Sequence, residues 1–292
     1  MIKKSIKKLT KKAGIEVRRI NNAPPEVMFF DTMKEALLYS QGGKQAGFQC
    51  SFEKTTHHSA LGFASKDWHP FVESARQLKD AFNTEYVDSI LYRFYQTFQP
   101  KSASAAIAGF EDTPNEFQNL SPHLLFLSPW VSQNAAEVEL DTRWWNEKDN
   151  VEHGAPHLNV DVDGWAYSGP VSNAKGELEF KRLKLLLKSL QENGYNLKYG
   201  GIGTTILKRG SEYRFLVGGG GYHRASALKA LNYESFPATF HRNSIVDIDD
   251  ASDWPNVKNG LWTESKAKAY VHHLFDFISK DWALNIGLPT QP

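Results

Sequence analysis

Four consecutive glycines stand directly before a tyrosine, a histidine and an arginine, and this run has the composition of an anion-binding loop. Glycine leaves main-chain N–H groups open to a phosphate. The arginine adds a fork of donors that suits a phosphate, and the histidine adds a titratable imidazole. We interpret the run as a phosphate-binding or nucleotide-binding segment, with a tight turn carrying ordinary polar residues as the alternative. The segment consists of Gly218, Gly219, Gly220, Gly221, Tyr222, His223 and Arg224.

The stretches on either side place this segment at the start of a helix. Glu212–Val217 is a short run of β-favouring residues, residues 222–231 show helical spacing, and Ser235–Phe240 is a second strand candidate. A helix that begins directly after glycines presents unpaired N–H groups and about half a positive charge. Asn232 can take the left-handed conformation that ends a helix. The resulting strand–loop–helix–strand unit favours an anion at the helix start.

A second group of polar residues follows in the middle of the chain. His153 and His157 are one helical turn apart, but the glycine and proline between them oppose a helix. Asp161 and Asp163 alternate in a predicted strand, so their side chains would point to the same face. Two such acids can share a magnesium ion or a sugar hydroxyl. The two aspartates are therefore candidate metal ligands, with a polar loop and an edge strand as the alternative.

Residues 176–240 resemble the ParB/sulfiredoxin superfamily, whose members carry a G-x-H-R motif that opens a helix after a strand. Residues 221–224 match that motif. Residues 182–194, with the strand-like stretch after them, resemble the helix and strand that precede it in the superfamily. The resemblance implies a mixed α/β core of that type over less than a quarter of the chain.

The branches of the superfamily differ in activity, and the motif residues distinguish them. Sulfiredoxins place a catalytic cysteine where this chain has Tyr222, which opposes that reaction. ParB proteins that bind CTP have a glutamate at this position and a second arginine where Ser226 stands, which opposes DNA partitioning. The small-molecule kinase branch shares the glycine, histidine and arginine, although Gly220 replaces its aspartate.

Similarity to the kinase branch implies a phosphotransferase that acts on a small polar acceptor, a sugar or an amino-acid derivative. It implies ATP, ADP or CTP as the nucleotide, with Mg²⁺ bridging the phosphates. A glutamate before the first family helix is the base in that branch, and either Glu177 or Glu179 matches it. Arg224 and the glycine amides would hold phosphates, and His223 would position groups or transfer a proton. The alternatives are a non-catalytic nucleotide-binding or scaffold protein at the membrane surface and a ParB-like nucleic-acid-binding protein.

Bulk properties restrict the partners. The chain has 292 residues and a net charge of +1, which makes nucleic acid an unfavourable partner. The single cysteine, Cys50, excludes an intrachain disulfide and fits the cytoplasm, the expected location. No apolar run approaches the roughly 20 residues of a membrane span. Residues 1–20 are basic with interspersed apolar residues, which suits either a solvated helix or peripheral binding to the anionic surface of an inner membrane.

We predict an α+β protein with a helical N-terminal half, a ParB/sulfiredoxin-like mixed α/β core and a C-terminal helix. The predicted parts are a basic amphipathic helix over residues 1–22, a mainly helical region over 23–140, the core domain over 141–245, and a linker with a helix over 246–292.

Periodicity predicts further elements along the chain. We expect helices at Met33–Ser40, 71–98, 179–192 and 263–276, and short strands at 124–130, 136–140, 165–170 and 198–207.

Overall fold

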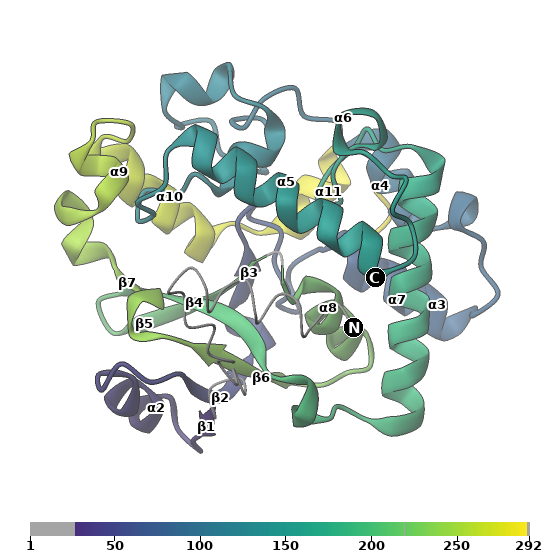
Figure 1. Cartoon of the computed structure of the whole chain (residues 1–292), viewed down its shortest axis with the longest axis horizontal. Coiled ribbons are helices and arrows are strands. Elements are labelled where there is room, and N and C mark those ends of the chain that lie inside the picture. Colours follow the sequence, from purple (N-terminus) through teal and green to yellow (C-terminus); the bar gives the residue numbers. More distant parts are fainter. Residues whose placement is uncertain (1–26, 219, 291–292) are drawn as a thin grey trace, which may run out of the picture.

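The computed structural model describes residues 27–218 and 220–290, which form an α+β fold (Figure 1). Within these residues one sheet has seven strands in the order β1-β2-β6-β4-β5-β3, and β7 pairs with β4. The sheet is mixed, because β4 pairs antiparallel with β5 but parallel with β6 and β7. The strands are β1 (Met28–Phe29), β2 (Ala46–Ser51), β3 (Thr55–His57), β4 (Ile202–Arg209), β5 (Glu212–Val217), β6 (Ser235–Phe240) and β7 (Ile245–Asp247).

Helices make up the rest of the regular structure, joined by short 3₁₀ turns. Among the residues that the structure describes, none of the helices combines the length and apolarity needed to cross a bilayer. The helices are α2 (Met33–Ser40), α3 (Pro70–Asp80), α4 (Ile90–Thr97), α5 (Ala135–Glu152), α6 (Val160–Asp163), α7 (Asn173–Asn193), α8 (Tyr222–Ala230), α9 (Pro255–Lys258), α10 (Glu264–Asp276) and α11 (Ser279–Asn285).

The central strands face two hydrophobic cores because successive side chains of a strand point to opposite faces. Ile206 of β4 and Phe215 of β5 lie in a core shared with α3, α7 and α8. Their neighbours Leu207 and Leu216 lie in a second core with α10. Figure 1 shows the sheet between these groups of helices. The β4–β5 pair is therefore anchored on both faces, which fixes the end of β5 where the glycine run begins.

The predicted strand–loop–helix–strand unit is confirmed. Glu212–Val217 and Ser235–Phe240 are strands, and the helix between them is α8. Ala225 and Leu228 of α8 are fully buried against α3 and α7. Asn232 has a φ of 65°, the left-handed conformation expected just after the helix. Local sequence signals were sufficient here because each element begins or ends at a strong breaker.

The N-terminal region contributes strands as well as helices, in contrast to the mainly helical region predicted for residues 23–140. β2 pairs antiparallel with the whole of β6, and β3 pairs parallel with β5. A single sheet therefore draws strands from both sides of the predicted boundary near residue 140. The basic helix predicted for residues 1–22 lies outside the described residues.

The amphipathic helix predicted over residues 71–98 is two helices, α3 and α4. Ser89 starts the second one, because its hydroxyl accepts a hydrogen bond from the N–H of Tyr92. Gln77 on α3 links the two, donating to the Asp88 carbonyl and accepting from the Ile90 N–H. The apolar spacing continues across the break, so periodicity alone predicted one helix. The helices predicted at Met33–Ser40 and near residues 263–276 are confirmed as α2 and α10.

The strands predicted at residues 124–130 and 136–140 are wrong. The first consists of the end of a 3₁₀ turn, Pro122–Phe126, and an irregular segment after it, and the second lies inside α5. Asn134 and Glu137 form a capping box at the start of α5, each side chain bonded to the other's main-chain N–H. The predicted strand at 165–170 is an irregular segment, while the one at 198–207 corresponds to β4.

Candidate functional site

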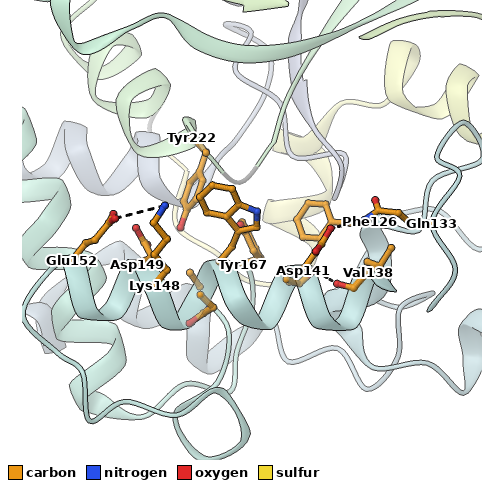
Figure 2. A pocket seen from close by; sticks show the side chains of 14 residues that line it. Phe126, Gln133, Val138, Asp141, Lys148, Asp149, Glu152, Tyr167 and Tyr222 are labelled. Carbon is orange, nitrogen blue, oxygen red and sulfur yellow. Dashed lines mark hydrogen bonds and ion pairs between the residues drawn. The ribbon is translucent and has the colours of Figure 1, made fainter. Parts of the chain in front are cut away.

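The start of α8 borders two cavities that share Gly220 and Asp149 as lining residues. The α5 cavity, about 470 Å³, lies along one face of α5, and Figure 2 shows Tyr222, Tyr167 and Phe126 above that helix. The α7 cavity, about 420 Å³, lies between α7 and the start of α8. The α5 cavity is lined from α5 by Asp141, Trp145, Asn146, Lys148, Asp149 and Glu152, and the α7 cavity is lined by Asp149, Lys181, Arg182, His223 and Arg224.

The two cavities carry opposite charge. Three cations, Lys181, Arg182 and Arg224, line the α7 cavity with one carboxylate, that of Asp149. Three carboxylates and one cation, Lys148, line the α5 cavity. Because charges in a recessed site act through a lower dielectric than bulk water, the α7 cavity favours an anion and the α5 cavity opposes one.

The described glycines of the loop lie at this junction. Gly220 lines both cavities, Gly221 lines the α7 cavity and Gly218 is half-buried, while Gly219 lies outside the described residues. Gly221 is the N-cap of α8, and no side chain caps the helix there. The start of a nine-residue helix thus faces the basic cavity, and its main-chain amides suit a phosphate group.

Among the described glycines of the loop, Gly221 alone is required by its packing. A Cβ atom on Gly221 would lie 2.4 Å from Cγ2 of Ile202, whereas one on Gly218 would meet nothing within 4 Å. We expect Gly221→Ala to lower the free energy of unfolding by about 1–3 kcal/mol, because β4 and α8 must separate to admit the methyl group. Urea unfolding measures the change, with Gly218→Ala as the matched control. Equal stability of the two variants would contradict the close packing of α8 on β4.

Arg224 is fixed at the rim of the α7 cavity. Its guanidinium donates to the carbonyl oxygens of Gly220 and Gly200, and to the hydroxyl of Tyr195. Tyr195 in turn donates to the same Gly200 carbonyl at 2.6 Å. These bonds tie the glycine loop to the segment before β4. They hold the Arg224 charge in place beside the helix start, where the sequence placed it.

His223 is buried beneath this rim and lies against the predicted glutamate. Its Nε2 is 2.9 Å from Oε2 of Glu179, a close contact that lacks the alignment of a hydrogen bond. The ring also packs edge-on against Phe71, with centroids 4.7 Å apart. Burial, together with the charge of Arg182, lowers the pKa of His223, so the imidazole is neutral at pH 7. It lines the α7 cavity as a neutral group that can accept or donate a proton.

Glu179 lies at the centre of a buried ionic network. It is fully buried and contacts Nζ of Lys175 at 2.7 Å and the Arg182 guanidinium at 2.8 Å. Burial alone would raise the pKa of Glu179, but Arg182, His223 and Lys175 hold it well below its usual value. Lys175 is itself 1% exposed and also donates to the Asn150 side chain. The network therefore orders α7 against α5 and α8.

The two predicted glutamates have different surroundings, and neither lines the described cavities. Glu177 is exposed on α7, whereas Glu179 is enclosed. Two residues along a helix are about 200° apart around its axis, so only one of the pair can face the core. The resemblance implied one of these glutamates as the catalytic base, whereas Glu179 is a buried partner of the His223 imidazole.

The carboxylate that borders both cavities is Asp149, which the sequence analysis did not select. Its side chain is 38% exposed and forms a two-pronged ion pair with Arg182, at 2.5 and 3.0 Å. Asp149 lies in the last turns of α5, and the capping box at Asn134 is the local signal from which that helix could have been predicted. Without α5, nothing in the sequence links Asp149 to a glycine loop some seventy residues later.

Asp161 and Asp163 do not share the face of a strand, because residues 160–163 form the short helix α6. Asp161 pairs with Arg143 at 2.9 Å. Asp163 accepts bonds from the Ser172 hydroxyl and the Asn159 N–H. The strand geometry that suggested a metal pair is therefore absent. Across residues 27–218 and 220–290, no cluster of three or more His, Cys, Asp or Glu side chains has the arrangement of a metal site.

Comparison of the chain with protein-family models, with curated proteins and with solved structures found no match in any of the three. The structure itself defines an α+β protein in which a glycine loop and helix start separate a basic cavity from an acidic one.

Proposed function

We propose that this chain is a nucleotide-binding phosphotransferase with a ParB/sulfiredoxin-like core, acting on a small polar acceptor in the cytoplasm. The observation that carries the proposal is the α7 cavity, where an uncapped helix start meets three cationic side chains. Helix amides and guanidinium groups together are the usual ligands of phosphate oxygens. The adjoining α5 cavity provides a separate place for the acceptor, on the other side of Gly220 and Asp149.

The phosphates of ATP, ADP or CTP would lie in the α7 cavity. Arg224 at the rim and Arg182 in the wall would hold phosphate oxygens, while the amides that follow Gly220 face the same space. Arg182 is held in place by Asp149 and Glu179 and lines the cavity from its buried side. Such fixed charges stabilise the transferring phosphoryl group without reorganisation during the reaction.

Asp149 is the group best placed to act as base, because it borders both cavities. In the proposed step an acceptor hydroxyl oxygen forms a bond to the terminal phosphorus, and the bond from that phosphorus to the bridging oxygen breaks. The hydroxyl proton passes to the Asp149 carboxylate, and the shortened nucleotide leaves with the electron pair of the broken bond. His223 lines the same α7 cavity and contacts Glu179, and it would orient the phosphates or exchange a proton there.

Asp149 is also the residue that fits a magnesium ion. Mg²⁺ in such sites is held by one or two carboxylates and by the substrate phosphates, so a dedicated cluster of protein ligands is not required. The partly exposed Asp149 carboxylate faces the place where the phosphates would lie. When bound there, the ion would offset phosphate charge. Asp161 and Asp163 line neither described cavity and so do not fit this role.

Nucleotide binding tests the proposal directly. We expect the full chain to bind ATP, ADP or CTP in calorimetry, and Arg224→Ala to weaken binding about tenfold to a hundredfold, the value of one or two charge-assisted bonds. Arg224→Lys should recover little, because lysine lacks the forked donor. Arg242→Ala is the matched control, since Arg242 is exposed and lines neither cavity. If the wild-type chain binds none of the three nucleotides, the proposal is wrong.

A second candidate is a non-catalytic protein that binds a nucleotide or another anion. Two observations favour it: Gly220 stands where kinases of this type have an aspartate, and Arg224 is bonded to main-chain carbonyls. Mass spectrometry of a metabolite mixture incubated with ATP and the full chain separates the two functions. Appearance of any phosphorylated acceptor supports the enzyme, and nucleotide binding without transfer supports the second candidate.

A further inference from the structure

We propose that the α5 cavity binds a pyranose carrying a free ammonium group, an amino sugar, and that this is the acceptor of the site. The role as acceptor rests on the proposed function, but the binding itself does not. The cavity volume of about 470 Å³ lies within the range of roughly 300–1,000 Å³ that small-molecule sites occupy. The inference follows from the aromatic and acidic side chains that line it.

Aromatic rings form much of the wall. Trp145 is 58% exposed although it lines the cavity, so its indole is available to a ligand. Tyr167, Tyr222 and Phe126 lie across from α5 in Figure 2. The flat faces of such rings suit the C–H face of a sugar ring, and their electron-rich centres attract a cation.

The cavity already attracts one ammonium group, that of Lys148. Its Nζ lies 4.7 Å from the centroid of the Trp145 ring and 3.8 Å from Oε1 of Glu152 (Figure 2 shows the ion pair). An indole with a carboxylate beside it is a recognised arrangement for binding an amine. The ammonium group of a ligand would likewise lie between an aromatic ring and a carboxylate, but nearer Asp141, at the other end of the cavity wall.

The carboxylates leave acceptor capacity for such a ligand. Asp141 is exposed and receives one bond, from the Gln133 amide at 2.5 Å. Each ionised carboxylate has about four lone-pair positions, so oxygens remain available for hydroxyl and ammonium donors. Asn146 adds a side-chain oxygen that is buried without a hydrogen-bond partner. With three carboxylates against one lysine, the cavity repels a uronate or a second nucleotide.

The arrangement also places the sugar beside the phosphates. Asp149 and Gly220 belong to both cavities, so a pyranose in the α5 cavity meets at this junction the group proposed to accept a proton. A hydroxyl on the ring can therefore approach the phosphorus while the ammonium group remains at the acidic wall. The phosphates would then lie in the basic α7 cavity and the ammonium group in the acidic α5 cavity.

Ligand-observed NMR on the full chain tests the inference with glucosamine, galactosamine and mannosamine. Their hydroxyl counterparts, glucose, galactose and mannose, and the uronates of the same rings are the comparison ligands. We expect at least one amino sugar to bind about tenfold more tightly than its hydroxyl counterpart at low salt, and the uronates not to bind. Equal binding of an amino sugar and its uronate, or no binding by any amino sugar, overturns the inference.

Two pairs of variants assign the binding to this cavity. Trp145→Ala and Asp141→Asn should each weaken amino-sugar binding about tenfold. Leu140→Ala and Glu147→Gln change exposed residues of α5 that do not line the cavity, and they should leave amino-sugar binding unchanged. Equal losses in both pairs would overturn the inference.

ADP binding, measured on the same samples, separates this inference from the proposed function. ADP binding without amino-sugar binding leaves the phosphotransferase proposal standing and refutes the acceptor class. Amino-sugar binding without binding of ADP, ATP or CTP refutes the phosphotransferase proposal and leaves the amino-sugar site standing.

Discussion

Glu179→Ala should lower the free energy of unfolding by about 3–5 kcal/mol, the cost of breaking a buried ion pair from one side. The change would leave the charge of Lys175, which is 1% exposed, inside the protein with the Asn150 side-chain oxygen as its remaining described partner. Arg182 would keep Asp149 but lose its second carboxylate. Urea unfolding followed by tryptophan fluorescence measures the loss.

Two further variants separate the buried charge from other effects of the substitution. Glu177→Ala is the matched control, because it lies on the same helix but is exposed, and we expect a change within about 0.5 kcal/mol. Replacing the pair together, Lys175→Met with Glu179→Leu, should recover much of the stability, because no unpaired charge then remains inside. A Glu179→Ala protein as stable as Glu177→Ala would show that the network does not stabilise the fold.

The second large effect is a loss of stability in mild acid. His57 and His69 are 3% and 4% exposed and lie side by side beneath the site. Burial lowers the pKa of His69 to about 3, with the charge of His223 adding to the shift, and it lowers the pKa of His57 well below its usual value. Below pH 6.5 the unfolded chain therefore binds protons that the folded protein does not. The free energy of unfolding consequently decreases as the pH is lowered.

Between pH 6.5 and pH 5 each of these histidines should contribute a loss of about 2 kcal/mol, from 1.36 kcal/mol per pH unit. Asp67 and Glu73 act in the opposite sense at lower pH, because burial raises their pKa values. Urea midpoints measured from pH 7.5 to 5 give the slope. The His69→Phe variant should show a shallower slope of midpoint against pH. The exposed control His241→Asn should keep the slope of the unchanged protein. A pH-independent midpoint over this range would contradict the burial of neutral histidines.

The glycine-loop unit could be predicted because its signals are local. β-favouring residues, four glycines, a run of helix formers and a capping asparagine follow one another within thirty residues, and each acts on its own neighbours. The structure has these elements with the predicted bounds to within one residue. The start of a helix at Tyr222, and hence the place where anions are favoured, needed no knowledge of the rest of the chain.

The α5 cavity could not be predicted in this way. Residues 136–140 alternate apolar and acidic side chains, a pattern that predicts a half-buried strand, although they lie in the first turns of α5. With a strand predicted at these residues, the helix that carries Trp145, Lys148 and Asp149 is missing from the prediction. The capping box at Asn134 was the one local signal for α5, and it lies just before the run.

The start of α8 directly after the glycines follows from neighbouring residue types, because backbone conformation is largely a local property. The acids that lie beside this helix start depend instead on contacts between distant parts of the chain. Glu177 and Glu179 are equivalent in a linear reading, and burial of one face of α7 encloses the second beside His223. Asp149 joins the site because the end of α5 is bonded to α7 through Asp149–Arg182 and Asn150–Lys175, and such long-range contacts depend on packing over the whole chain.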